Sequence, residues 1–183
     1  MPEGARLPVD WIDAAVELLA RTGTRGTMIV RGTSMEPTLA PGSVIEVDFS
    51  PAHIRAGDLL VFRQAELIVV HRLVSGRRGG KLLRTQGDAC PDPDPPVARD
   101  DVLGRVTALE RSPGARLSLD EAPARRYARA VAAGLRVSAG LIRCASITDT
   151  LLGRIGIRPG LRPRLTTAQR AALRLAQHRL EPR

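Results

Sequence analysis

The pattern of hydrophobic and polar positions changes twice along the chain. Near the start, apolar residues recur every three or four positions from Trp11 to Leu19 and stop before Gly23, which is typical of a short amphipathic helix. From residue 27 to residue 109 the apolar runs are short, β-branched and separated by turn residues. This pattern predicts strands at residues 27–30, 44–48, 59–63, 67–74, 81–85 and 102–109.

A helical pattern begins after residues 112–114, which read Ser-Pro-Gly. Ser118 and Glu121 have the spacing of a capping box, and beyond them arginines and apolar residues fall on opposite faces of a helix. Two prolines in residues 158–164 interrupt this pattern, and a last short helix is expected from Thr166.

These patterns together predict a mainly β fold in three parts. We expect an N-terminal amphipathic helix in residues 1–26, a β-rich domain in residues 27–112 and a basic helical extension in residues 113–183. A length of 183 residues suits one compact domain with an appendage and is short for two domains. Aromatic residues form only 2% of the chain, which argues against a surface that stacks nucleic-acid bases.

The charge is unevenly distributed. Residues 1–110 hold 13 basic and 15 acidic side chains, whereas residues 111–183 hold 15 and 4, so the net charges are −2 and +11. The C-terminal part is therefore the candidate for contact with an anionic partner. A compositional bias is the alternative cause, because Lys81 is the only lysine in an arginine-rich chain.

Cysteine usage and hydropathy limit the classes of protein that fit. Cys90 and Cys144 are too few and too far apart for a disulfide framework or a recognisable metal site, so we expect no metal and no cofactor. The sequence shows no signal peptide and no apolar run of about 18 residues that would span a bilayer. A cytoplasmic protein, free or peripheral at the membrane, is expected.

Ser34 is the candidate nucleophile. A serine hydroxyl is a weak nucleophile near neutral pH, so a catalytic serine needs a base within hydrogen-bond reach and donors for the developing oxyanion. Gly32 permits close backbone approach beside Ser34, and Pro37 fixes the chain after it. The alternative is a turn serine, because serine beside glycine and proline commonly forms turns.

His71 is the candidate base, because it closes the apolar run 67–70 and a strand would hold its ring rigidly. The alternative is a partly buried histidine that binds a backbone group. Asp88 and Asp94 are the candidate carboxylates that would select the tautomer of the imidazole. On local grounds Asp88 equally fits an Asx turn, and Asp94 fits a solvated loop.

Four segments, in order, resemble the conserved boxes of the type I signal peptidase family. They carry the nucleophile, a structural strand, the general base and the closing Gly-Asp motif, and they lie at residues 32–39, 57–63, 70–74 and 86–89 with 102–106. The resemblance covers residues 32–109.

The resemblance implies a serine peptidase in which Ser34 attacks the scissile carbonyl. Many bacterial members carry lysine as the base, whereas this chain has His71 there, like the endoplasmic-reticulum type, which implies a Ser-His mechanism through an acyl-enzyme. Asp88 matches the Gly-Asp position of the family, and Asp94 matches the place where His-type members have a second aspartate. Both remain candidates for the third catalytic residue.

Three departures from the family pattern bear on this interpretation. Gly32 stands where some members have a serine that assists the oxyanion hole, so backbone N–H groups would have to suffice. Cys90 stands where asparagine is common, and the transmembrane anchor of secretory members is missing.

Two functions follow as hypotheses. The first is a serine endopeptidase that processes a leader or tail of a protein or peptide, after small side chains if the specificity of the family holds. The alternative is a regulatory or inactive peptidase-fold module that binds an anionic partner through its basic tail, as in self-cleaving repressor relatives. Those relatives pair serine with lysine and carry an N-terminal helix-turn-helix, for which residues 1–26 are too short, so nucleic acid is not the expected partner. Residues 118–145 are expected to contact an anionic membrane surface or to pack on the β domain.

Overall fold

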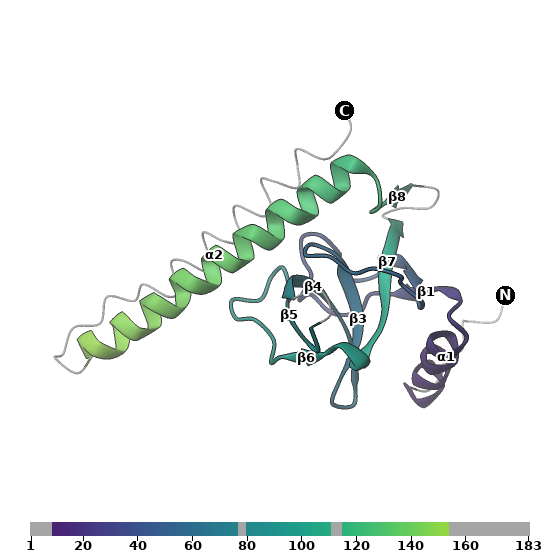
Figure 1. Cartoon of the computed structure of the whole chain (residues 1–183), viewed down its shortest axis with the longest axis horizontal. Helices are drawn as coiled ribbons and strands as arrows, with labels where there is room; N and C mark the ends of the chain where they lie inside the picture. Colours follow the sequence, from purple (N-terminus) through teal and green to yellow (C-terminus); the bar gives the residue numbers. More distant parts are fainter. Residues whose placement is uncertain (1–8, 77–79, 111–114, 154–183) are drawn as a thin grey trace.

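The structure is a computed structural model that describes residues 9–76, 80–110 and 115–153. Its centre is one antiparallel sheet, with α1 (Val9–Thr22) and α2 (Ala122–Gly153) on different sides of it (Figure 1). The strands of the described residues are β1 (Arg25–Ile29), β2 (Val44–Asp48), β3 (Leu59–Gln64), β4 (Leu67–Gly76), β5 (Leu82–Gln86), β6 (Val97–Ala98), β7 (Val102–Glu110) and β8 (Arg116–Ser118). The expected mainly β fold with an N-terminal and a C-terminal helix is confirmed.

The sheet brings together strands that are distant in the sequence. Its order is β1-β2-β7-β3-β4-β5-β6, and β8 pairs with β7 beside this path. The register shifts within the β2–β7, β3–β7 and β4–β5 pairs, and such irregularities increase local twist. The sheet therefore places the loop that follows β1 and the first half of β4 around one cleft.

The segment before α2 differs from the expectation. The sheet continues past residue 112, because Arg116–Ser118 forms β8 against β7. The predicted capping box is wrong: Ser118 ends a strand, and its hydroxyl accepts a hydrogen bond from the backbone N–H of Asp120 at 3.3 Å. Helix α2 begins at Ala122, with Pro123 in the first turn, where the missing N–H of proline costs no hydrogen bond.

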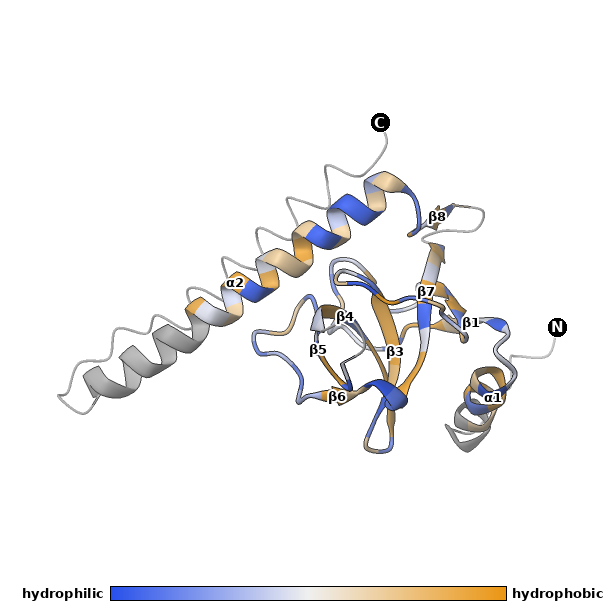
Figure 2. Cartoon of the chain, in the orientation of Figure 1, coloured by the Kyte–Doolittle hydropathy of each residue, from blue (hydrophilic) through white to orange (hydrophobic). Residues whose placement is uncertain are grey.

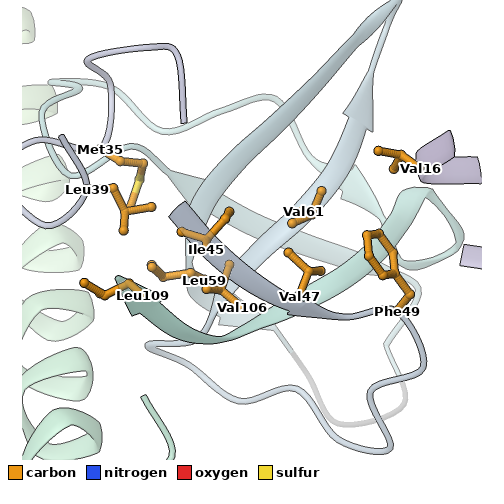
Figure 3. Packing of buried hydrophobic residues seen from close by; sticks show 10 residues of the cluster. All are labelled: Val16, Met35, Leu39, Ile45, Val47, Phe49, Leu59, Val61, Val106 and Leu109. Carbon is orange, nitrogen blue, oxygen red and sulfur yellow. The ribbon is translucent and has the colours of Figure 1, made fainter. Parts of the chain in front are cut away.

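The core consists mainly of aliphatic side chains from the sheet, the loop after β1 and α1. Alternate residues of β2 are buried, and β3 is buried on both faces over its first four positions. Figure 3 shows ten side chains of this cluster, which are Val16, Met35, Leu39, Ile45, Val47, Phe49, Leu59, Val61, Val106 and Leu109. Met35 and Leu39 belong to the loop that carries Ser34, so the core anchors that loop.

Helix α2 packs its apolar face against the β domain over its first half. Val131 and Leu135 are buried with Val74 of β4. Apolar and charged residues alternate along the helix (Figure 2), and Val137 and Leu141, farther along, are 63% and 51% exposed. Up to Leu135, the apolar face of α2 therefore packs on the β domain, which is one of the two expected contacts, and is not free to enter a lipid surface. The predicted interruption at residues 158–164 and the last helix lie outside the described residues.

None of the helices in the described ranges is long and apolar enough to cross a membrane.

Candidate active site

Ser34 lies in the loop between β1 and β2, at the start of a turn that is anchored in the core. The neighbouring Met35 and the nearby Leu39 are almost completely buried, and the N–H of Leu39 donates to the carbonyl of Met35 at 2.9 Å. Ser34 itself is half-buried and lines a cleft. The anchored turn therefore holds the Ser34 hydroxyl at the boundary between core and solvent.

His71 lies on β4 and connects Ser34 to an aspartate. Its Nε2 atom is 3.0 Å from Oγ of Ser34, and its Nδ1 atom is 2.8 Å from Oδ2 of Asp94. The side chain of His71 is 9% exposed and that of Asp94 is 11% exposed, so both are largely shielded from water. An imidazole that donates from Nδ1 to a carboxylate keeps Nε2 free to accept a proton from a hydroxyl.

Asp88 has different neighbours from Asp94. Its carboxylate accepts two hydrogen bonds from Arg72, from Nε at 2.8 Å and from Nη2 at 2.6 Å, and one from the Thr38 hydroxyl. Arg72 and Asp88 are both almost completely buried. Burial opposes the charge of Arg72, but the charge and hydrogen bonds of Asp88 outweigh this effect and raise the pKa of Arg72 above its ordinary value.

The structure thus brings Ser34, His71 and Asp94 together and places Asp88 in a separate ion pair. The ion pair lies directly behind the site, because Arg72 follows His71 in β4 and Thr38 lies four residues after Ser34. Successive residues of a strand point to opposite faces, so β4 presents His71 on one side and Arg72 on the other.

Gly87 allows the loop of Asp88 to lie against the Ser34 turn. The N–H of Ala89 donates to the carbonyl of Ser34 at 2.8 Å. A Cβ atom on Gly87 would lie 2.6 Å from that carbonyl oxygen and 3.0 Å from Nε2 of His71. Any larger residue at position 87 would displace the serine or the histidine.

Sequence reasoning missed three residues that support the site, which are Thr85, Arg72 and Gly57. Thr85 donates from Oγ1 to Oδ2 of Asp94 at 2.7 Å, and Arg72 donates from Nη1 to the carbonyl of Gly57 at 2.9 Å. The sequence did hold one signal for Arg72, because it directly follows the candidate base. In a strand buried on both faces, the residue after His71 is itself buried, and a buried arginine needs an acidic partner. The partners of Thr85 and Gly57 left no signal in the local sequence.

A cleft of about 350 Å³ opens beside Ser34. One wall comes from the end of β1 and the residues after it, and the other comes from the start of β4. Its lining is mostly apolar, with Arg31 and Glu66 as the charged members. Such a cleft can accommodate apolar side chains of a peptide next to the Ser34 hydroxyl.

Within the described residues, no cluster of three or more His, Cys, Asp or Glu side chains is placed to hold a metal ion.

The sequence profile of the Peptidase S24-like family matches residues 7–107. This segment contains Ser34, His71 and Asp94, and it ends within β7, so α2 lies beyond it. No match was found among the curated proteins.

Proposed function

The chain belongs to the Peptidase S24-like family, and from this membership together with the geometry around Ser34 we propose that it is a serine endopeptidase with a Ser-His-Asp mechanism. Ser34 is the nucleophile, His71 the general base and Asp94 the carboxylate that orients His71. The observation that supports this assignment most strongly is the continuous series of contacts from Ser34 Oγ through the imidazole of His71 to Asp94, at 3.0 and 2.8 Å.

The reaction proceeds in two halves. Nε2 of His71 takes the Ser34 proton while Oγ attacks the scissile carbonyl carbon, and the imidazolium then gives this proton to the leaving amine. The resulting acyl-enzyme is hydrolysed by a water molecule that His71 deprotonates in the same way. Asp94 keeps the Nδ1–H tautomer and stabilises the imidazolium in both halves.

Backbone donors stabilise the oxyanion in this proposal. Gly32 offers no hydroxyl near Ser34, so the N–H of Ser34 and its neighbours would bind the developing charge. A Cβ atom on Gly32 would meet no atom within 4 Å, so the space beside the turn is open to a substrate carbonyl.

Two open strand edges support an extended peptide as the substrate. Among the described strands, β1 pairs only with β2. Residues 67–71 of β4 pair with β3, and β5 joins β4 only from Arg72 onward. A peptide in the cleft can therefore add its backbone hydrogen bonds to these free edges, while its apolar side chains enter the lining.

The finer proposal is an enzyme similar to the Ser-His type of type I signal peptidase. An extended segment that binds between free strand edges is what the leader or tail of a protein can offer, whereas a folded region cannot. We therefore propose that the enzyme matures a protein or peptide by removing such a segment, with small side chains before the cleaved bond.

Digestion of a library of extended peptides, read by mass spectrometry, tests the proposed activity. The wild-type protein is expected to cut a defined subset of peptides, and Ser34→Ala is expected to cut none of them. Ser50→Ala, which changes an exposed serine outside the cleft, is the matched control and should cut the same subset. Equal digestion by wild type and Ser34→Ala would refute the assignment.

The exposed arginines of α2 favour a second role, which is contact with an anionic membrane surface. Arg126, Arg129 and Arg136 are exposed on the helix that extends past the β domain (Figure 1). Flotation of the whole chain with vesicles that contain anionic lipid should carry the protein upward at low salt and lose it at high salt. Absence of flotation at low salt would refute the lipid contact, and salt-sensitive retention on DNA would favour the regulatory alternative.

A further inference from the structure

Asp94 lies on a loop that has few ways to hold it. Four of the six residues from 91 to 96 are prolines, which have no backbone N–H to donate. The N–H of Asp94 is one of the two that remain, and it donates to the carbonyl of Thr85 at 3.0 Å. The side chain of Asp94 also receives the Thr85 hydroxyl, at 2.7 Å. Thr85 therefore holds both the backbone and the carboxylate of Asp94.

Thr85 is itself rigidly placed. It lies on β5, where it pairs with Leu73 of β4, and it is completely buried. A buried hydroxyl requires a partner, and an ionised carboxylate can only accept, so the Thr85 hydroxyl donates to Asp94. Strand β5 thus fixes the direction of a donor that points at a side chain on a loop.

The hydroxyl of Thr85 and the ring of His71 bind the same oxygen. Oδ2 of Asp94 lies 2.7 Å from Oγ1 of Thr85 and 2.8 Å from Nδ1 of His71. Two donors on one oxygen restrict rotation of the carboxylate about the Cβ–Cγ bond. Without such partners, this torsion angle of aspartate has a broad distribution. The geometry points to Thr85 as a positioning residue: it holds the Asp94 carboxylate in the orientation from which that carboxylate orients His71. This inference rests on the proposed function, in which Asp94 acts through His71.

Two substitutions separate the hydroxyl of Thr85 from its volume. Thr85→Val keeps the shape and removes the donor, whereas Thr85→Ser keeps the donor and removes a methyl group. With a fluorophosphonate probe that reacts with activated serines, Thr85→Val should react about 10- to 100-fold more slowly at Ser34, by analogy with the loss seen when outer-shell partners of metal-bound histidines are removed. Thr85→Ser should stay within about threefold of wild type. An equal loss in both variants would assign the effect to packing and overturn the inference.

A double-mutant cycle tests whether Thr85 acts through Asp94. In an Asp94→Ala background, Thr85→Val should cause no further loss, because the group that it positions is absent. The same fold loss in both backgrounds would overturn the inference.

A proton NMR measurement distinguishes failure of this inference from failure of the proposed function. The Nδ1–H proton of His71, identified by its absence in His71→Ala, should give a downfield resonance in wild type and in Thr85→Ser. The resonance should be lost or shifted upfield in Thr85→Val. If Ser34 does not react with the probe, the proposed function fails, while the resonance still reports on Thr85. An unchanged resonance in a folded Thr85→Val protein overturns the positioning role whatever the activity.

Discussion

At the scale of single residues, two aspartates six positions apart have opposite surroundings. Asp94 contacts a histidine and a threonine, and 11% of its side chain is exposed. Asp88 is fully buried and binds the guanidinium of Arg72 through two hydrogen bonds. Removal of the Asp94 charge should therefore lower the reaction rate of Ser34, and removal of the Asp88 charge should lower the stability of the fold.

Asp94→Asn is expected to lower the rate of Ser34 acylation by about 10⁴-fold, because the amide cannot hold the reactive tautomer of the imidazole. The free energy of unfolding in urea should stay within about 1 kcal/mol of wild type, because no buried charge loses its partner. Asp92→Asn, which changes an exposed aspartate on the same loop, is the control and should react at the wild-type rate. A rate for Asp94→Asn close to that of wild type would contradict the role of Asp94.

Asp88→Asn is expected to destabilise the protein by about 3–5 kcal/mol, because it leaves the buried charge of Arg72 without a counter-charge. Urea denaturation followed by circular dichroism measures this loss. A change of less than about 1 kcal/mol, well below the cost of breaking a buried ion pair, would show that the pair is not buried as described.

Asp58 gives a dependence of stability on pH. Burial raises the pKa of its carboxyl above the ordinary value of 3.8, although hydrogen bonding to the backbone of Arg55 acts in the opposite direction. The folded state therefore binds this proton more tightly than the unfolded state does, and its contribution to stability falls as the pH rises above about 3.8.

Asp58→Asn should remove this penalty and retain an oxygen that accepts from the Arg55 N–H. The variant is expected to melt at a higher temperature than wild type at neutral pH, and the difference should shrink as the pH falls toward 4. Equal melting temperatures across that range, by scanning calorimetry, would contradict the burial effect.

At the scale of elements, β4 joins the site to the helix behind it. His71 faces the serine, Arg72 faces the ion pair, and Val74 packs on α2. The apolar run of residues 67–70 predicted the strand, and the histidine at its end was recognisable as the candidate base. The burial of Arg72 was not predictable locally, because the carboxylate that neutralises it lies 16 residues later in another loop.

The longer strands were predictable from the sequence, and the shortest strands were not. The expected strand at residues 44–48 coincides with β2, and the other five expected strands lie within two residues of β1, β3, β4, β5 and β7. Strands β6 and β8 have two and three residues, too few for a periodic pattern, and their hydrogen bonds depend on β5 and β7. The sequence also left open which aspartate contacts His71. Tertiary contacts with Thr85 and His71 hold Asp94 in place, whereas the local sequence around Asp94 resembles an exposed loop.

Gly57, in the loop before β3, lies in close contact with α2. Its φ is +102°, and a Cβ atom would lie 2.8 Å from the backbone carbonyl carbon of Ala128 in α2. The carbonyl oxygen of Gly57 also accepts from Arg72. The backbone of α2 is thus in contact with the residue that holds the buried ion pair.

Gly57→Ala is expected to destabilise the protein by more than Gly42→Ala. Gly42 has a φ of +87°, and a Cβ atom there would meet nothing within 4 Å, so its substitution causes backbone strain alone, about 1–3 kcal/mol. The excess loss at Gly57, measured by urea denaturation, reports the contact with α2. Equal losses at the two glycines would contradict the docking of α2 on this loop.

At the scale of the whole molecule, a segment of the Peptidase S24-like family is followed by a basic segment that contains α2. The Peptidase S24-like segment ends at residue 107, and the net charge changes from −2 over residues 1–110 to +11 over residues 111–183. The first half of α2 packs on Val74 of β4 and lines one pocket with Arg72 of the ion pair, while the arginines at positions 126, 129 and 136 are exposed. Helix α2 therefore packs on the β domain with one face and exposes arginines on the other, which we propose as the contact for an anionic partner.

Reaction with a fluorophosphonate probe, followed by intact mass and peptide mapping, tests the central claim that Ser34 is a nucleophile activated by His71. The wild-type protein is expected to gain one adduct, on Ser34, and Ser50→Ala should react at the same rate. Ser34→Ala should gain none, and His71→Ala should react about 10²- to 10⁴-fold more slowly, the usual contribution of a general base. Equal labelling of wild type, Ser34→Ala and His71→Ala would contradict the claim.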